Sequence, residues 1–125
     1  MMTKEFRNKT FLYHRNADFW NGLHGWEPET FDVLDAYLGP GKTFVDVGAW
    51  NGILSLYASS LGAIAMAYEP DEVAYEEMAE NVNVNHALVF MSKFGVSNGN
   101  DTKRVMYNID KFGNSMSSTF RQEGE

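Results

Sequence analysis

The chain has 125 residues, which fits a single domain, and 44% of them are hydrophobic, enough to bury a core. Its formal net charge of −7 argues against a general affinity for nucleic acid, because phosphate binding depends on basic charge. The lack of cysteine excludes disulfides, thiolate zinc sites and thiol nucleophiles.

No apolar run approaches the ~20 residues that a membrane-spanning helix needs. The basic residues near the N-terminus are not followed by the apolar stretch of a secretory signal. We therefore expect a cytoplasmic location and no membrane partner.

Residues 1–26 are predicted as an N-terminal aromatic segment, and because they show no clean helix or strand period, no element is assigned to them. Basic side chains are interleaved there with the rings of Phe6, Phe11, Tyr13, Phe19, Trp20 and Trp26. A local nucleic-acid patch is the disfavoured interpretation. We expect the rings to pack over the core or the ligand site, with the charges in solvent.

Residues 27–112 are predicted as a Rossmann-like, cofactor-binding domain that begins with a helix. The helix starts at Glu27-Pro28-Glu29, because proline is tolerated in a first turn and acids there oppose the helix dipole. Apolar residues recur on one face from Phe31 to Leu38, and Gly39-Pro40-Gly41 ends the helix.

Three strands are predicted after this helix, at Thr43 to Val47, at 63–69 and at 88–94. The second is a near-continuous apolar run, which is typical of a strand buried on both faces of a parallel sheet. Helices are predicted between them, from Ile53 to Leu61 and after Asp71, whose side chain is placed to cap the helix.

This alternation indicates an α/β fold, a doubly wound and mostly parallel sheet with flanking helices and right-handed crossovers. A turn cluster follows at Asn98 to Asp101, and residues 103–109 are predicted as a strand that returns antiparallel. Residues 113–125 are predicted as a polar tail.

The turn from Gly48 to Gly52 lies where parallel sheets bind nucleotide-like ligands. A dinucleotide fingerprint needs glycine where this chain has Trp50 and Ile53, which disfavours a nicotinamide-dependent reductase, and no phosphate-loop Gly-Lys-Ser/Thr follows. Glu69 lies 21 residues after Gly48, about where an acid reaches both ribose hydroxyls in such folds.

Three segments together resemble the first motifs of class I S-adenosylmethionine-dependent methyltransferases, in particular the FkbM-type family. They are Val45-Asp-Val-Gly-Ala-Trp-Asn-Gly52, Ala67-Tyr-Glu-Pro-Asp71 and Glu80-Asn-Val-Asn-Val-Asn85. The resemblance runs from about Trp26 to Ser118 and implies a Rossmann-like class I methyltransferase fold. It also implies S-adenosylmethionine as cofactor and O-methyl transfer to a small molecule or sugar.

The resemblance implies that Asp46 and the glycine turn contact the methionine and ribose parts of the cofactor, and that Glu69 binds the ribose hydroxyls. Pro70 and Asp71 would shape the adenine side, with Gly95 or Val96 near the adenine. The implied cofactor-binding residues are Asp46, Gly48, Ala49, Trp50, Asn51, Gly52, Glu69, Pro70, Asp71, Gly95 and Val96.

Plainer interpretations stay open for several of these residues. Turn glycines often serve only the turn, and Glu69 can be an acid that merely leads a helix. Asn51 is either a ligand contact or a helix N-cap, and Trp50 is either core or pocket wall.

No catalytic residue stands out. His14, His24 and His86 are candidate bases, but an ordinary surface histidine is the favoured interpretation for each. No spacing of histidines and carboxylates indicates a metal site. Methyl transfer is helped mainly by positioning, so a conspicuous base is not required. The predicted partner is a small-molecule methyl acceptor.

The resembled family has a larger sheet in which the first strand is central, whereas this chain supplies three parallel strands and a hairpin strand. We therefore expect a fold truncated after them, with an open edge at Thr43 to Val47. The chain is then the cofactor-binding part of a longer or split protein, or it pairs with another copy or a partner chain. The alternative function is a non-catalytic methyltransferase-like binding module that acts through a partner.

Overall fold

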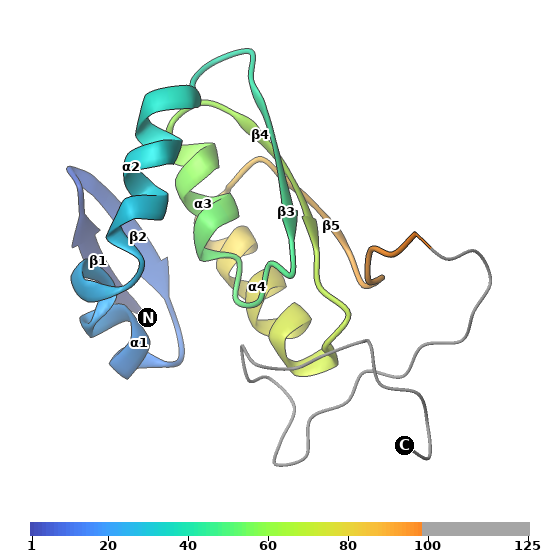
Figure 1. Cartoon of the computed structure of the whole chain (residues 1–125). Helices are drawn as coiled ribbons and strands as arrows, with labels where there is room; N and C mark the ends of the chain where they lie inside the picture. The colour runs from blue at the N-terminus through green and yellow to red at the C-terminus, as the bar shows by residue number, and fades with distance from the viewer. Residues whose placement is uncertain (99–125) are drawn as a thin grey trace.

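The computed structural model describes residues 1–98, in which a hairpin and helices lie against one side of a small parallel sheet (Figure 1). The elements are β1 (Met2–Phe6), β2 (Lys9–Tyr13), α1 (Ala17–Asn21), a 3-10 turn η1 (Leu23–Gly25), α2 (Pro28–Tyr37), β3 (Thr43–Val47), α3 (Ile53–Ser60), β4 (Ile64–Tyr68), α4 (Glu72–Val84) and β5 (Val89–Ser92). The predicted strand at 103–109 and the tail at 113–125 lie outside these residues.

The parallel sheet has the strand order β3-β4-β5, so β4 is central and β3 is an edge within the described chain. Thr43 pairs with Ile64 at the start of one ladder, and Ala65 pairs with Val89 at the start of the other. The predicted bounds of β3 are those observed, and β4 and β5 are slightly shorter than predicted. The predicted α/β arrangement of parallel strands and flanking helices is confirmed.

Within residues 1–98 only one face of this sheet is covered. α3 and α4 lie on the same face (Figure 1), where Ala65 and Ala67 of β4 are buried. On the other face Val45, Met66 and Phe90 stand in register across the three strands and are 56%, 38% and 61% exposed. The prediction that β4 is buried on both faces is therefore wrong for the described chain, because both crossover helices lie on one side.

The β1–β2 hairpin was not predicted from the sequence. Arg7 and Asn8 form its two-residue turn with φ of 49° and 65°, and two successive positive values are typical of the type I′ turn that suits hairpin twist. Asparagine tolerates this conformation but arginine seldom adopts it. The turn lacks the glycine that usually marks such hairpins, so the pattern gave little signal.

The guanidinium of Arg7 explains how this turn is held. Its Nη1 lies 2.9 Å from carboxylate oxygens of both Asp32 and Asp35 on α2, and its Nη2 donates to the carbonyl of Pro28 at 3.2 Å. These bonds fasten the hairpin tip to α2.

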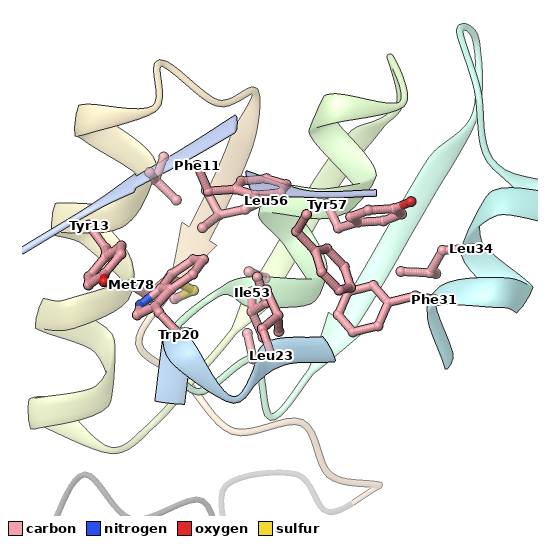
Figure 2. Packing of buried hydrophobic residues seen from close by; sticks show 14 residues of the cluster. Phe11, Tyr13, Trp20, Leu23, Phe31, Leu34, Ile53, Leu56, Tyr57 and Met78 are labelled. Carbon is pink, nitrogen blue, oxygen red and sulfur yellow. The ribbon is translucent and has the colours of Figure 1, made fainter. Parts of the chain in front are cut away.

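The core lies between the hairpin and helices α2, α3 and α4 (Figure 2). The ring of Phe31 meets those of Phe6 and Tyr57 edge-on, with centroids 4.8 and 5.0 Å apart. Trp20, which is fully buried, stacks on Tyr13 at 5.0 Å. The N-terminal rings thus pack into the core, as expected, while the division of the chain into domains at residue 26 stays a prediction.

Asn85, just after α4, ties that helix to the hairpin. Its Oδ1 accepts from the N–H of Leu12 at 2.8 Å, and its Nδ2 donates to the carbonyls of Leu12 and Asn81, each at 2.8 Å. The side-chain amide therefore replaces a neighbouring strand along the open edge of β2. No helix among residues 1–98 is long and apolar enough to cross a membrane.

We expect Asn85→Ala to lower the free energy of unfolding by about 1–3 kcal/mol, because it leaves two half-buried backbone groups of Leu12 without their partner. Urea denaturation measures the loss. The control is Asn83→Ala on the exposed side of α4, which should change stability little. Equal losses in the two variants would contradict the bridging role of Asn85.

Candidate functional site

The turn that follows β3 is anchored to the end of β4. The N–H groups of Gly48 and Ala49 both donate to the carbonyl of Tyr68, at 2.9 and 3.0 Å. Three turn residues have positive φ, which is 74° at Gly48, 55° at Trp50 and 84° at Gly52. The backbone here follows a path that suits glycine, and one of the three positions holds tryptophan.

Gly52 is required by close packing as well as by its φ. A Cβ at this position would lie 2.8 Å from Cγ of Met78, a fully buried side chain on α4. At Gly48 a Cβ would meet nothing within 4 Å, and the residue is exposed. The turn therefore packs on α4 at its far end and faces open space at its beginning.

Glu69 is the group that holds this turn to the next element. Its Oε1 accepts from the N–H of Trp50 at 2.6 Å, and its Oε2 accepts from the N–H of Asp71 at 2.9 Å. The residue is only 6% exposed. A carboxylate oxygen has two lone pairs, so each oxygen keeps acceptor capacity beyond the bond shown.

Burial raises the pKa of Glu69, and the N–H bonds from Asp71 and Trp50 oppose that rise. The nearby charges of Asp71 and Asp46 add to it. The negative charge of Glu69 is thus partly desolvated and is stabilised by backbone N–H groups.

Asp46 lies on the helix-covered face of β3. Its Oδ2 accepts from the hydroxyl of Ser55 on α3 at 2.7 Å, and burial raises its pKa while the hydrogen bonds from Ser55 oppose the rise. Ser55 is a site residue that the sequence did not single out, because a serine within an apolar helix carries no distinctive pattern.

Asn51 is fully buried and serves the start of α3. Its Oδ1 accepts from the N–H of Ile53 at 3.1 Å, and its carbonyl accepts from Nδ2 of Asn81 on α4 at 2.9 Å. The N-cap of α3 is Gly52, so Asn51 is not the cap itself, although its side chain bonds to the first residue of the helix. Its role as a ligand contact stays a prediction. Asn81 lies in a motif that the sequence singled out without assigning it a role.

The remaining predicted residues surround the same edge of the sheet. Asp71 caps α4 as predicted, its Oδ1 accepting from Val73 and Ala74 at 2.9 and 3.2 Å, and it is 1% exposed. Pro70 is half-buried, and Ala49 is 5% exposed. Gly95 and Val96 follow β5 and are exposed.

Three aromatic side chains meet beside the turn, and sequence reasoning did not group them. The ring of Trp50 lies 4.7 Å from that of Phe19, nearly perpendicular at 83°, and 6.0 Å from that of Trp26. The rings of Phe19 and Trp26 are 5.3 Å apart. We call these residues, all half-buried, the aromatic triad. No spacing links them, because they come from three separate elements.

His14, His24 and His86 are all exposed. Among residues 1–98, no group of three or more histidine, aspartate or glutamate side chains is arranged to hold a metal ion. The described chain therefore assigns no catalytic base.

Comparison with known proteins identifies relatives that match most of the chain. The family model described as ribosomal protein L11 methyltransferase (PrmA) matches residues 18–109. The ribosomal protein L11 methyltransferase of Lactococcus lactis subsp. lactis is 36% identical over 88 residues, covering 68% of this chain and 28% of the relative. That of Bacillus cereus strain Q1 is 38% identical over 68 residues, 54% of this chain and 22% of the relative.

Two solved structures share the fold. A provisionally named rRNA methylase from Clostridium thermocellum has a TM-score of 0.51 at 17% identity, over 67% of this chain and 43% of that one. A provisionally named transferase from Pyrococcus horikoshii has a TM-score of 0.51 at 16% identity, over 74% of this chain and 36% of that one. At these identities the likeness concerns the fold alone.

These findings confirm the class predicted from the motifs and correct its finer parts. The class I methyltransferase assignment is confirmed, whereas the FkbM type is not shown. The predicted small-molecule acceptor is wrong, because the relatives are named for methylation of a protein, ribosomal protein L11. The chain spans just over a quarter of the length of the first relative, 28%.

The two turn glycines provide a matched pair of stability tests. We expect Gly48→Ala to lower the free energy of unfolding by about 1 kcal/mol, the cost of a positive φ without a clash. Gly52→Ala should cost about 2–4 kcal/mol, because overpacking against Met78 adds to the same backbone strain. Urea denaturation of both variants measures the two losses. Equal losses would show that the side chain of Met78 can move away from the added methyl group without lowering the stability.

Proposed function

The chain belongs to the ribosomal protein L11 methyltransferase (PrmA) family, and on this premise we propose that it binds S-adenosylmethionine for methyl transfer to a protein acceptor. The observation that carries the proposal is the clamp of Glu69 on the glycine turn. A buried carboxylate with spare acceptor capacity lies beside exposed Gly48 at the carboxyl edge of a parallel sheet.

The residues at this edge fit the cofactor. The open space around Gly48 leaves room for a ligand close to the backbone, and Glu69 offers two oxygens to the two ribose hydroxyls. In the proposal, Asp46 and the turn from Gly48 through Ala49, Trp50 and Asn51 to Gly52 hold the ribose and methionine parts. The adenine side is shaped by Pro70, Asp71, Gly95 and Val96.

When bound, S-adenosylmethionine supplies an activated methyl group on a positively charged sulfur. The chain's own contribution is to hold the cofactor in one orientation, and positioning of this kind can lower a displacement barrier substantially. Asp46 and Asn51 also fix the shape of the site, because their hydrogen bonds with Ser55 and Ile53 hold the turn and the start of α3 in place.

The acceptor is proposed from the relatives, which are named for ribosomal protein L11. A cytoplasmic location remains part of the proposal and agrees with an acceptor of the ribosomal kind. Because the chain spans 28% of the first relative, methyl transfer by this chain on its own is also a proposal.

We expect Glu69→Gln to weaken S-adenosylmethionine binding about 10- to 100-fold, because the amide has one acceptor oxygen and turns its NH2 group toward a backbone N–H. Isothermal titration calorimetry measures the dissociation constant. Glu76→Gln on the exposed side of α4 is the control and should bind like the wild type. A wild-type chain that gives no binding heat would overturn the proposed function.

The same titration should depend on pH. Burial raises the pKa of Glu69 above its ordinary 4.5, so its carboxylate takes up a proton at a higher pH than an exposed glutamate would. Protonation removes acceptor capacity for the ribose hydroxyls. Wild-type affinity should therefore fall as the pH is lowered from 7.5 through the raised pKa, whereas the affinity of Glu69→Gln should stay nearly level. Parallel pH profiles would show that Glu69 does not bind the cofactor.

Acceptor class is tested by following labelled methyl groups. With labelled S-adenosylmethionine and purified ribosomal protein L11, we expect label in the protein fraction, and less with Glu69→Gln than with the wild type. Transfer from the wild type that is no faster than from Glu69→Gln would contradict enzymatic methylation by this chain.

A further inference from the structure

The backbone conformation of Trp50 is costly for a bulky residue. Its φ of 55° lies in the left-handed region, where a bulky residue is strained by roughly 1–2 kcal/mol. Glycine would adopt the same backbone freely, as Gly48 and Gly52 do on either side. Within residues 1–98, Trp50 is neither in the buried core cluster nor among the side chains packed against it. Strain of this kind is commonly retained at functional sites.

The backbone of Trp50 is fastened where the cofactor's ribose is proposed to bind. Its N–H donates to Oε1 of Glu69 at 2.6 Å, so the ring extends from a point next to the proposed ribose ligand. In S-adenosylmethionine the sulfonium is bonded to the 5′-carbon of that ribose. The side chain of Trp50 begins beside the proposed ribose ligand, and the sulfonium is one bond away from that ribose, so the ring is within reach of the positive charge.

The neighbours of Trp50 suit a cation. Phe19 and Trp26 complete an arrangement in which three rings contact one another within 6.0 Å, and all remain partly open to solvent. Aromatic faces attract onium ions, and clustered rings are the usual device for binding them. The acidic groups of Asp46 and Glu69 add negative potential at the same edge.

We propose that the aromatic triad of Phe19, Trp26 and Trp50 binds the sulfonium charge of S-adenosylmethionine and so distinguishes it from the neutral product S-adenosylhomocysteine. The inference rests on the proposed function, because it places a specificity role at the same cofactor site. Methyl transfer removes the positive charge from the sulfur, so the three rings bind the product S-adenosylhomocysteine more weakly than S-adenosylmethionine.

The test is calorimetric titration of the same protein with both ligands. Trp50→Leu removes the ring and should raise the dissociation constant for S-adenosylmethionine about 2- to 30-fold, the range expected of a cation–π contact, while that for S-adenosylhomocysteine stays nearly unchanged. Trp50→Phe keeps an aromatic face and should retain most of the discrimination.

Phe90→Leu is the matched control, since it removes an exposed ring from the uncovered face of the sheet, away from the turn. It should alter neither constant. If thermal unfolding shows that Trp50→Leu has lost its fold, Phe19→Leu is titrated in its place and should show a selective loss in the same direction.

Equal weakening of both ligands would overturn the proposal, because the rings would then hold a part that the two ligands share. Unchanged binding of both would overturn it as well. Neither result would affect the proposed function, which fails only if the wild type binds neither ligand, and in that case the inference fails with it.

Discussion

The candidate site depends on one buried carboxylate. Glu69 directly follows β4, and through two hydrogen bonds it joins the turn after β3 to Asp71 at the start of α4. Among residues 1–98 no basic side chain pairs with this carboxylate. The N–H groups of Trp50 and Asp71 stabilise its charge instead, as backbone N–H groups do at a helix N-terminus. This arrangement has a structural consequence for Trp50. Because the N–H of Trp50 is held by Glu69, the residue stays in a conformation that its side chain disfavours.

Side-chain amides extend this rigidity to the rest of the described chain. Asn81 on α4 donates to the carbonyl of Asn51 in the turn, and Asn85, one helical turn later, pairs with both backbone groups of Leu12 in the hairpin. One helix therefore holds the turn on one side and the N-terminal hairpin on the other. The asparagines of the Glu-Asn-x-x-x-Asn motif act here as structural ties, which is why a motif near a cofactor site need not consist of ligand contacts.

The aromatic N-terminal segment has two roles in this structure. Phe6, Phe11 and Tyr13 of the hairpin fill the core, whereas Phe19 and Trp26 lie at its border and contact the turn. These two border rings therefore pack against the core on one side and against Trp50 of the turn on the other. The opposite face of the sheet, with Val45, Met66 and Phe90 exposed, takes no part in this arrangement.

The sequence by itself determined the parallel strands, the turn after the first of them and the methyltransferase class. Each of these rests on local information, namely β-forming runs, glycine positions and short motifs. It led to the wrong acceptor, since no local pattern in the chain encodes acceptor chemistry. Only the tertiary structure decided that, within residues 1–98, helices cover β4 on one face. The same holds for the hairpin turn at Arg7 and Asn8 and for the meeting of Phe19, Trp26 and Trp50. These features depend on contacts between residues far apart in the chain, and such contacts leave no period or spacing to read. The strained backbone of Trp50 could not be predicted from the sequence either. Its positive φ depends on the groups that hold the residue in place, above all the carboxylate of Glu69.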